Sequence, residues 1–205
     1  MLKLTHIALG ALLAATPAAL AEDAFTPEQV TVKAAIDPGP NVFVYQEEWK
    51  GAGSLAVFAQ DSLKLKGLLP TGAMGQMLIA PDGKTAWAQS SYLKRIVYGP
   101  NEQVLQTFDI DTLAIKGEAI LPPKAAMALG YSALLRLSSD GKLIFVQNAT
   151  PASSVTVADA ATGATLQEVP TPGCWGIYPL PGKSGFASIC GDGTFSTVTI
   201  SADGK

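Results

Sequence analysis

Histidine is almost missing from this sequence of 205 residues, since the single one, His6, lies close to the N-terminus. Residues 1–21 have the pattern of a secretory signal peptide: a lysine, a short apolar stretch and an Ala-x-Ala cleavage pattern before Glu22. We therefore expect the mature chain to contain no imidazole. That expectation argues against a Ser-His-Asp triad, a Cys-His pair and histidine-based metal sites.

Long apolar runs and excess charge are also scarce. The apolar part of the expected signal peptide is short and is interrupted by Pro17, although a membrane anchor is the alternative reading. Removal of Lys3 from the 14 basic residues would leave 13, against 17 acidic ones, and thus a formal charge of −4. This balance gives no reason to expect binding to nucleic acid or to an anionic membrane.

The sequence contains only two cysteines, Cys174 and Cys190. An exported chain enters an oxidising compartment, so this pair is expected to form a disulfide between two neighbouring strands that flank the Pro181-Gly182 turn. The alternative is a pair of reactive or metal-binding thiols. Neither cysteine has a second sulfur or a histidine at ligand spacing, so the disulfide is the favoured interpretation.

Short β-prone runs, separated by turns, fill the chain after residue 40. The clearest unit is residues 135–170, in which an Asp-Gly turn joins two apolar runs, a pattern typical of hairpins. No convincing amphipathic helix is predicted. The predicted strands are 41–45, 54–59, 63–69, 76–79, 85–89, 104–108, 114–121, 135–137, 143–147, 154–158, 164–169, 174–179, 185–190 and 194–200. Residues 70–75 are expected to break the pattern, and residues 90–103 are expected to form a long loop.

Aspartates in the predicted turns recur at a nearly constant spacing. In one set the spacings are 58 and 52 residues, and in the other they are 50 and 48 residues. The two sets are Asp82, Asp140 and Asp192, and Asp61, Asp111 and Asp159. A period near 50 residues with strand-only units is typical of a β-propeller.

We therefore predict an all-β chain with three regions: a signal peptide at 1–21, an N-terminal arm at 22–40 and a partial β-propeller at 41–205. About three and a half blades fit into the last region. Propellers usually close with four to eight blades, so we suspect that the sequence is the N-terminal half of a longer product.

Few side chains are candidates for chemistry. The turn aspartates could serve as acid/base or calcium groups, but Asp commonly starts tight turns by binding its own backbone. The adjacent Glu47 and Glu48 point apart in extended backbone. A glycosylation sequon at Asn148 is followed directly by proline and is interpreted as a chance match. Trp49 lies between charged residues in a loop, where an indole needs a packing partner or lines a channel.

Five short motifs stand out after residue 120. They are LPPK at 121–124, SDGK at 139–142, QNATPASS at 147–154, GCW at 173–175 and ICGDG at 189–193. Together they resemble the heavy subunit of quinoprotein amine dehydrogenases, and the aromatic amine dehydrogenase branch more than the methylamine dehydrogenase branch. Tyr92, Arg95 and Gly99 also match a family pattern, but residues 100–103 replace the basic residues expected after them.

The resemblance implies a seven-bladed propeller in a periplasmic heterotetramer of two heavy and two light subunits. Such enzymes oxidise primary amines to aldehyde and ammonia. Their cofactor, tryptophan tryptophylquinone, forms from two tryptophans of the light subunit, and a blue copper protein of the azurin or amicyanin type accepts the electrons. This chain would then provide scaffold, a docking surface for the light subunit and part of the substrate channel, with Trp49 as the channel candidate. It would contribute no catalytic residue, cofactor or metal.

Two other functions remain open. One is a secreted propeller that binds a protein or a small ligand without any enzymatic partner. The other is a hydrolase that uses carboxylates, which would require acidic side chains to converge on one pocket.

Overall fold

The computed structural model describes residues 27, 32–49, 51–96, 98–127 and 130–201. The chain divides into two units, 1–32 and 33–205, and every described strand belongs to the second. The predicted signal peptide lies outside the described residues. The end of the predicted arm, from residue 33, belongs to the second unit: the Ile36 amide donates to the Asp111 carbonyl at 2.7 Å and the Ile36 side chain packs on the core.

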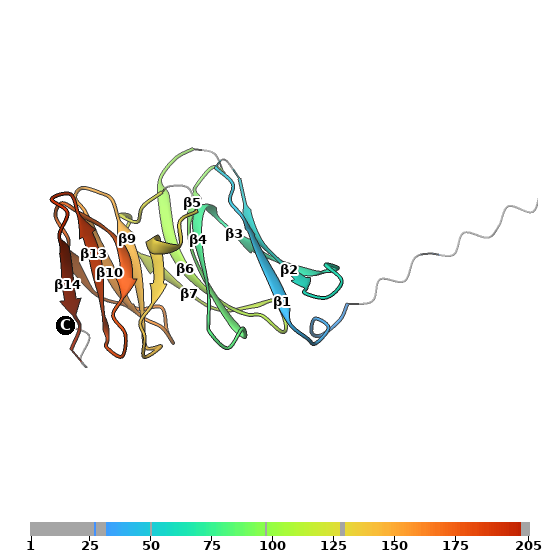
Figure 1. Ribbon diagram of the computed structural model, residues 1–205. Helices are drawn as coiled ribbons and strands as arrows, with labels where there is room; N and C mark the ends of the chain where they lie inside the picture. The colour runs from blue at the N-terminus through green and yellow to red at the C-terminus, as the bar shows by residue number, and fades with distance from the viewer. Residues whose placement is uncertain (1–26, 28–31, 50, 97, 128–129, 202–205) are drawn as a thin grey trace, which may run out of the picture. The chain divides into compact units, whose positions relative to one another are not determined.

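The second unit consists of four antiparallel sheets, each built from strands that follow one another in sequence (Figure 1). Sheet 1 contains β1 (Asn41–Gln46), β2 (Gly53–Ala59) and β3 (Leu65–Thr71). Sheet 2 contains β4 (Ala73–Ile79), β5 (Thr85–Leu93), β6 (Asn101–Asp109) and β7 (Ala114–Leu121). Sheet 3 contains β8 (Leu135–Leu137), β9 (Leu143–Asn148), β10 (Ser154–Asp159) and β11 (Thr165–Pro170). Sheet 4 contains β12 (Cys174–Pro179), β13 (Gly185–Cys190) and β14 (Phe195–Thr199).

One backbone hydrogen bond recurs in all four sheets and shows which strands are equivalent. The carbonyl of the residue just before β1, β5, β9 or β13 accepts a hydrogen bond from the amide of the residue just after the following strand. The pairs are Gln60 to Pro40, Ile110 to Lys84, Ala160 to Lys142 and Ile200 to Ser184. Within the described residues, sheet 1 thus lacks the equivalent of β4, and sheet 4 lacks the equivalent of β7. Fourteen strands make three and a half four-stranded blades, which confirms the predicted partial propeller.

The period near 50 residues, however, was counted partly on turns that are not equivalent. Asp82 and Asp140 lie in the β4–β5 and β8–β9 turns, whereas Asp192 lies between β13 and β14. The turn of sheet 4 that matches the first two is the Pro181-Gly182 turn, because Leu180 bonds Gly185 as Ala80 bonds Thr85. The three described Asp-Gly pairs all lie in turns but at two different places of the blade, so the pair does not mark a fixed position.

The second set of aspartates mixes two positions in the same way. The oxygen of Asp109 accepts bonds from the amide and hydroxyl of Thr112, and Asp159 does the same with Thr162. These two aspartates are equivalent and are 50 residues apart. Asp61 and Asp111 occupy a different place, two residues further along the turn.

The connections at the two ends of the sheets differ in length. At one end, here called the constant end, five connections have five residues and one has four: 60–64, 80–84, 110–113, 138–142, 160–164 and 180–184. At the opposite end, called the variable end, they range from Gly72 alone to the thirteen residues 122–134. That longest connection contains the 3-10 turn η1 (Ser132–Leu134).

Two predicted irregular segments are strands instead. Residues 70–75 were expected to break the pattern, but β3 ends at Thr71 and β4 begins at Ala73. The expected loop at 90–103 shrinks to 94–100, because β5 continues to Leu93 and β6 begins at Asn101. Ser90 and Ser91 are weak strand formers, yet both are buried in the ladder, so tertiary pairing overrides propensity here.

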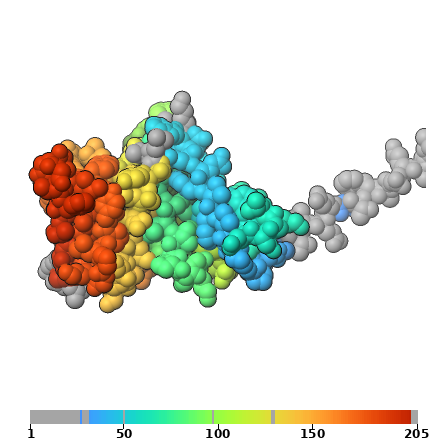
Figure 2. Space-filling model, in the orientation of Figure 1, coloured from blue at the N-terminus to red at the C-terminus, as the bar shows by residue number. Residues whose placement is uncertain are grey.

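Apolar side chains fill the space between successive sheets, which follow one another in chain order (Figure 2). Sheets 1 and 2 share Leu55, Leu69 and Phe108, all essentially inaccessible to solvent. Between sheets 3 and 4 the rings of Phe145 and Phe186 meet at 5.1 Å. Each fully buried side chain of this size contributes about 1.5–3 kcal/mol, so the blades depend on their neighbours for stability.

The two outer faces of this stack are apolar and have no described sheet against them. On sheet 4, Trp175, Ile189 and Phe195 are cross-strand neighbours and are 39%, 45% and 68% exposed. On sheet 1, Val44 and Leu68 are also exposed. None of the described segments is a helix long and apolar enough to cross a membrane.

Candidate functional site

Side chains from three sheets meet around the 122–134 connection at the variable end. Glu47, which follows β1, accepts a hydrogen bond from the Gly130 amide through Oε2 at 2.6 Å. Gln76 of β4 accepts one from the Tyr131 amide at 3.0 Å. The hydroxyl groups of Tyr131 and Tyr178 of β12 lie 3.0 Å apart. The segment at Gly130 and Tyr131 is therefore fixed by sheets 1, 2 and 4 at once.

Tyr45 of β1 lies two positions before Glu47, so in extended backbone the two side chains point to the same side. Burial raises the pKa of its hydroxyl, the nearby Glu47 charge raises it further, and the Thr71 side chain partly offsets both effects. The hydroxyl is fully enclosed and lacks a well-formed hydrogen bond among the described residues. It fits only because residue 75 is glycine, since a Cβ there would lie 2.7 Å from the hydroxyl oxygen.

Trp49, the predicted channel residue, lies two positions after Glu47 and is 53% exposed. Its amide donates to Glu48 Oε1 at 2.9 Å, and the Glu48 carbonyl accepts from the Met74 amide at 2.9 Å. The β1–β2 connection is thereby folded onto the start of β4. Glu47 and Glu48 point to different partners, as expected for neighbours in extended backbone.

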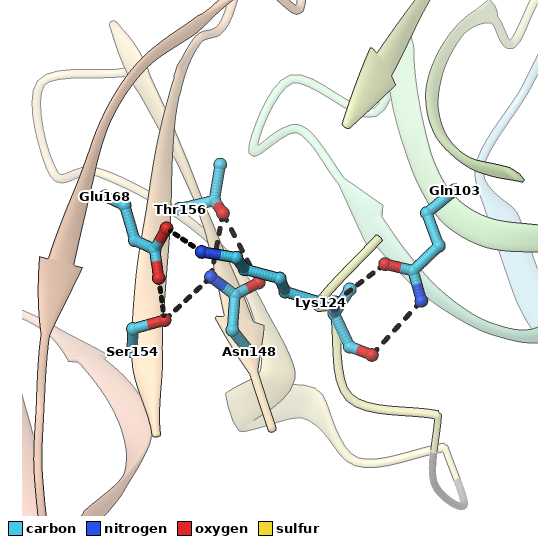
Figure 3. Close-up of polar contacts among 7 residues, drawn as sticks. Gln103, Lys124, Asn148, Ser154, Thr156 and Glu168 are labelled. Carbon is cyan, nitrogen blue, oxygen red and sulfur yellow. Dashed lines mark hydrogen bonds and ion pairs between the residues drawn. The ribbon is translucent and has the colours of Figure 1, made fainter. Parts of the chain in front are cut away.

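The 122–134 connection is also bonded to sheets 2 and 3 near its start (Figure 3). The Gln103 side chain of β6 bonds the backbone of Ala125 twice, accepting at 2.7 Å and donating at 3.2 Å. The Ala149 amide donates to the Lys124 carbonyl at 2.9 Å. Lys124 Nζ also pairs with Glu168 of β11 at 2.6 Å. One short segment thus links two blades.

Asn148 is the buried centre of this contact in sheet 3, only 1% exposed (Figure 3). Its Nδ2 donates to Ser154 Oγ at 3.0 Å and to Thr156 Oγ1 at 2.9 Å. Ser154 in turn donates to Glu168 Oε1 at 2.7 Å. An amide used in this way is not available for a glycan, which supports the interpretation of the sequon as a chance match.

Gln147 connects sheet 3 with sheet 4. Its Nε2 donates to the carbonyls of Asn148 and Ser154, and its Oε1 accepts from the Gly176 amide of β12 at 3.0 Å. Gln89 occupies the equivalent position in β5, 58 residues earlier, and is equally buried. Its amide nitrogen has no partner among the described residues.

The predicted disulfide is confirmed. Cys174 and Cys190 are directly paired residues of β12 and β13, with Cα atoms 3.8 Å apart and bonded sulfurs. The bond ties the variable end of sheet 4, where Gly191 also donates to the Gly173 carbonyl.

Several of the turn aspartates bind their own turns, as the sequence predicted. Asp82 and Asp192 accept amide bonds from residues two positions later. Hydrogen bonds from Thr112 and Thr162 lower the pKa of Asp109 and Asp159. Among the described residues, no three His, Cys, Asp or Glu side chains are grouped to hold a metal ion.

The family-like residues before Gly99 also have structural partners. Tyr92 donates through its hydroxyl to Gln106 Oε1 at 3.0 Å, and Gln106 donates to Glu118 at 2.9 Å. The Arg95 guanidinium lies over the Tyr98 ring at 5.3 Å, within range of a cation–π contact.

Comparison with known proteins identifies the family. The profile of the methylamine dehydrogenase heavy chain (MADH) matches residues 44–205, which is well over half of the sequence. The chain belongs to the methylamine dehydrogenase heavy chain family. This membership confirms the resemblance to the heavy subunit drawn from the motifs after residue 120, while the preference for the aromatic amine dehydrogenase branch stays a prediction.

Curated heavy chains are distant relatives. The chain is 23% identical over 130 residues to the methylamine dehydrogenase heavy chain of Methylobacillus flagellatus, which covers 63% of this chain and 32% of that protein. It is 24% identical over 144 residues to the methylamine dehydrogenase heavy chain of Methylophilus methylotrophus, which covers 70% of this chain and 35% of that protein. The chain thus spans about a third of the length of these heavy chains, as a partial heavy-chain domain would.

A solved structure supports the fold. Dihydro-heme d1 dehydrogenase NirN, in complex with DHE, superimposes with a TM-score of 0.58 at 16% identity, over 86% of this chain and 35% of that one. At this identity the likeness concerns the fold alone.

Residues of the heavy-chain motifs form polar contacts in and between blades, and they form the disulfide. Lys124 and Gln147 link blades, Asn148 bonds within sheet 3, and Cys174 and Cys190 form the disulfide. Tyr45, Gln76, Tyr131 and Tyr178 were not singled out from the sequence, because nothing local marks them. For Gln147 alone a sequence signal was available. Gln89 precedes it by 58 residues, the same spacing as between Asp82 and Asp140.

Proposed function

We propose that this chain is part of the heavy subunit of a periplasmic amine dehydrogenase that oxidises primary amines to aldehyde and ammonia. The observation that carries the proposal is the heavy-chain family match over residues 44–205, which coincides with the four propeller sheets. The disulfide supports export, because such bonds persist in oxidising compartments.

The cofactor of such an enzyme, tryptophan tryptophylquinone, is proposed to reside in the light subunit. When present, it takes electrons from the amine and passes them to a blue copper protein of the azurin or amicyanin type. The tryptophans of this chain do not suit the role, since Trp49 lies in the β1–β2 connection, Trp87 in β5 and Trp175 in β12. Trp87 is buried and donates its Nε1 proton to the Ala160 carbonyl at 3.2 Å, which is a packing role.

The variable end is the proposed docking surface for the light subunit and the proposed border of the substrate channel, in a heterotetramer of two heavy and two light subunits. Its connections differ in length, and recognition commonly resides in such connections on a rigid scaffold. It also carries exposed aromatic side chains, among them Trp49 and Tyr131.

The test is to purify the full-length heavy subunit with and without its candidate light subunit. Visible absorption and amine-dependent dye reduction should appear only in the complex. Activity from the heavy subunit alone would overturn the docking role. An inert, colourless complex would favour a secreted binding propeller instead.

Trp49 can be tested in the same complex. If its indole borders the channel, Trp49→Ala should change the KM for amines more than it changes the quinone content. Trp49→Phe is the matched control, since it keeps an aromatic ring at the same place. Its KM should stay close to the wild-type value. Equal KM values for wild type and Trp49→Ala would remove Trp49 from the channel.

A further inference from the structure

Arg136 of β8 is a half-buried cation whose charge has no partner among the described residues. The described lysines and arginines are otherwise exposed, apart from Lys66 and Lys124. Lys66 donates to Asn41 Oδ1 at 2.6 Å, and Lys124 pairs with Glu168. The Arg136 guanidinium forms neither an ion pair nor a hydrogen bond with any described residue. A cation partly removed from water without an acceptor costs free energy, so this position favours an anionic ligand.

The pairing of β8 fixes the direction of the Arg136 side chain. Leu135 and Leu137, its neighbours in the strand, pack on the core between sheets 2 and 3. Side chains alternate between the two faces of a strand, so Arg136 lies on the opposite face. Its cross-strand partner is Phe145, whose ring meets Phe186 of sheet 4. The Arg136 side chain therefore leaves β8 on the side of sheet 4.

Arg136 lines a pocket of about 600 Å³ at the constant end. The pocket borders β4, β8 and β12, which are the equivalent first strands of sheets 2, 3 and 4, and β8 contacts both of the others. Apolar side chains from all three sheets line it: Leu78, Ile79, Pro81, Leu137 and Pro179. A pocket of this volume accommodates a small organic molecule.

The other polar side chains of this pocket already have partners. Ser139 donates to a backbone carbonyl of the β12–β13 turn at 2.7 Å. Asp140 accepts from the hydroxyl groups of Ser138 and Ser184, and no ion pair joins it to Arg136. Among the described residues, the guanidinium is thus the charged donor that the pocket leaves free.

We propose that this pocket binds a small organic acid, with the carboxylate on Arg136 and an apolar body against the other side chains. A guanidinium offers two parallel N–H donors that match the two oxygens of a carboxylate. The apolar side chains remove the body of the ligand from water. An inorganic anion would use the charge alone, so the pocket favours an organic acid. The site lies at the constant end, opposite the surface proposed for the light subunit, and it does not depend on the proposed function.

The chain offers a variant and a matched control for this pocket. Arg136→Gln removes the charge and keeps a polar side chain. Lys142→Gln removes the same charge from the next turn, at an exposed lysine that does not line the pocket. Arg136→Lys keeps the charge and removes the two parallel donors. The measurement is equilibrium dialysis of hexanoate, and of the neutral hexanamide, with the full-length heavy subunit at neutral pH.

The wild type should bind hexanoate at least about tenfold more tightly than hexanamide, the gain expected from charge-assisted hydrogen bonds. Arg136→Gln should lose this preference while its hexanamide binding stays unchanged. Arg136→Lys should keep part of the preference, and Lys142→Gln should resemble the wild type.

Three results would overturn the proposal. The first is equal loss of hexanoate binding in Arg136→Gln and Lys142→Gln. The second is displacement of hexanoate by inorganic phosphate at equal concentration, which would indicate an unspecific anion site. The third is no hexanoate binding to the wild type, the result expected if another carboxylate of the full-length chain pairs with Arg136.

Discussion

The hydroxyl of Ser184, in the β12–β13 turn, donates a hydrogen bond to Oδ2 of Asp140, in the β8–β9 turn. The other oxygen of Asp140 accepts from the hydroxyl of Ser138 at 2.6 Å and from the Lys142 amide at 3.3 Å. One carboxylate thereby closes its own turn and joins sheets 3 and 4 at the constant end.

This arrangement predicts a defined pH dependence. Hydrogen bonds from Ser138 and Ser184 lower the pKa of Asp140 below its ordinary value of 3.8. Because the folded-state pKa lies below the unfolded one, the stabilisation is complete above the unfolded pKa and is lost as pH falls through the folded pKa. In urea unfolding of the full-length heavy subunit, Asp140→Asn should reduce the loss of stability between about pH 5 and about pH 2. Ser184→Ala should give part of this effect, and an unchanged pH profile in both variants would contradict the assignment.

Asn148 is predicted to be the most sensitive residue of the polar network that includes Ser154, Glu168 and Lys124. Asn148→Ala leaves the buried hydroxyls of Ser154 and Thr156 without their donor, so the free energy of unfolding should fall by about 2–3 kcal/mol. The half-exposed Lys124–Glu168 pair provides the comparison, since Lys124→Met should cost about 1 kcal/mol or less. Denaturant unfolding of the full-length subunit measures both. A larger loss for Lys124→Met would show that the exposed pair contributes more to stability than the buried bonds of Asn148.

The disulfide should be complete and stabilising. Thiol labelling of the denatured, unreduced mature protein should detect no free cysteine. Since Cys174 and Cys190 close a loop with a sequence separation of 16, replacing both by serine should lower the free energy of unfolding by about 3 kcal/mol in the chain-entropy model. Two reactive thiols per chain would refute the bond in solution.

The outer face of sheet 4 predicts how the 205-residue chain behaves alone. Trp175, Ile189 and Phe195 form an exposed apolar row, so the isolated chain should associate and melt broadly. Phe195→Lys should reduce this association, measured by light scattering. Thr197→Lys adds the same charge to the same strand without removing an apolar side chain, and it should help less. A sharp two-state transition from a soluble wild-type monomer would count against this behaviour.

Much of the fold follows from local sequence signals. Alternating apolar residues and Asp-Gly turns predict the strands of sheet 3 almost residue by residue. The same signals fail at the start of β4 and the end of β5, where glycine and serine lie in strands only because neighbouring strands pair with them. The Ser90 hydroxyl, for example, accepts the Gly72 amide proton at 3.0 Å, a contact that no local pattern announces.

The candidate site was far less predictable. Trp49 attracted attention because an exposed indole in a charged loop is unusual. The Glu47 carboxylate bonds the Gly130 amide, which is 83 residues away in sequence, so no local pattern indicates this contact. Tyr131 and Tyr178 lie in different parts of the propeller, and only the arrangement of its blades brings their hydroxyl groups together. A site assembled from several blades leaves little trace in any one stretch of the sequence.

The unequal ends of the sheets have a consequence for how such a protein can change. The bonds that join neighbouring strands into a repeating frame, from Gln60 to Pro40 through Ile200 to Ser184, all lie at the constant end. Insertions and deletions at the other end leave this frame untouched. New loops can therefore be acquired or grafted there one at a time without breaking any of these four frame bonds.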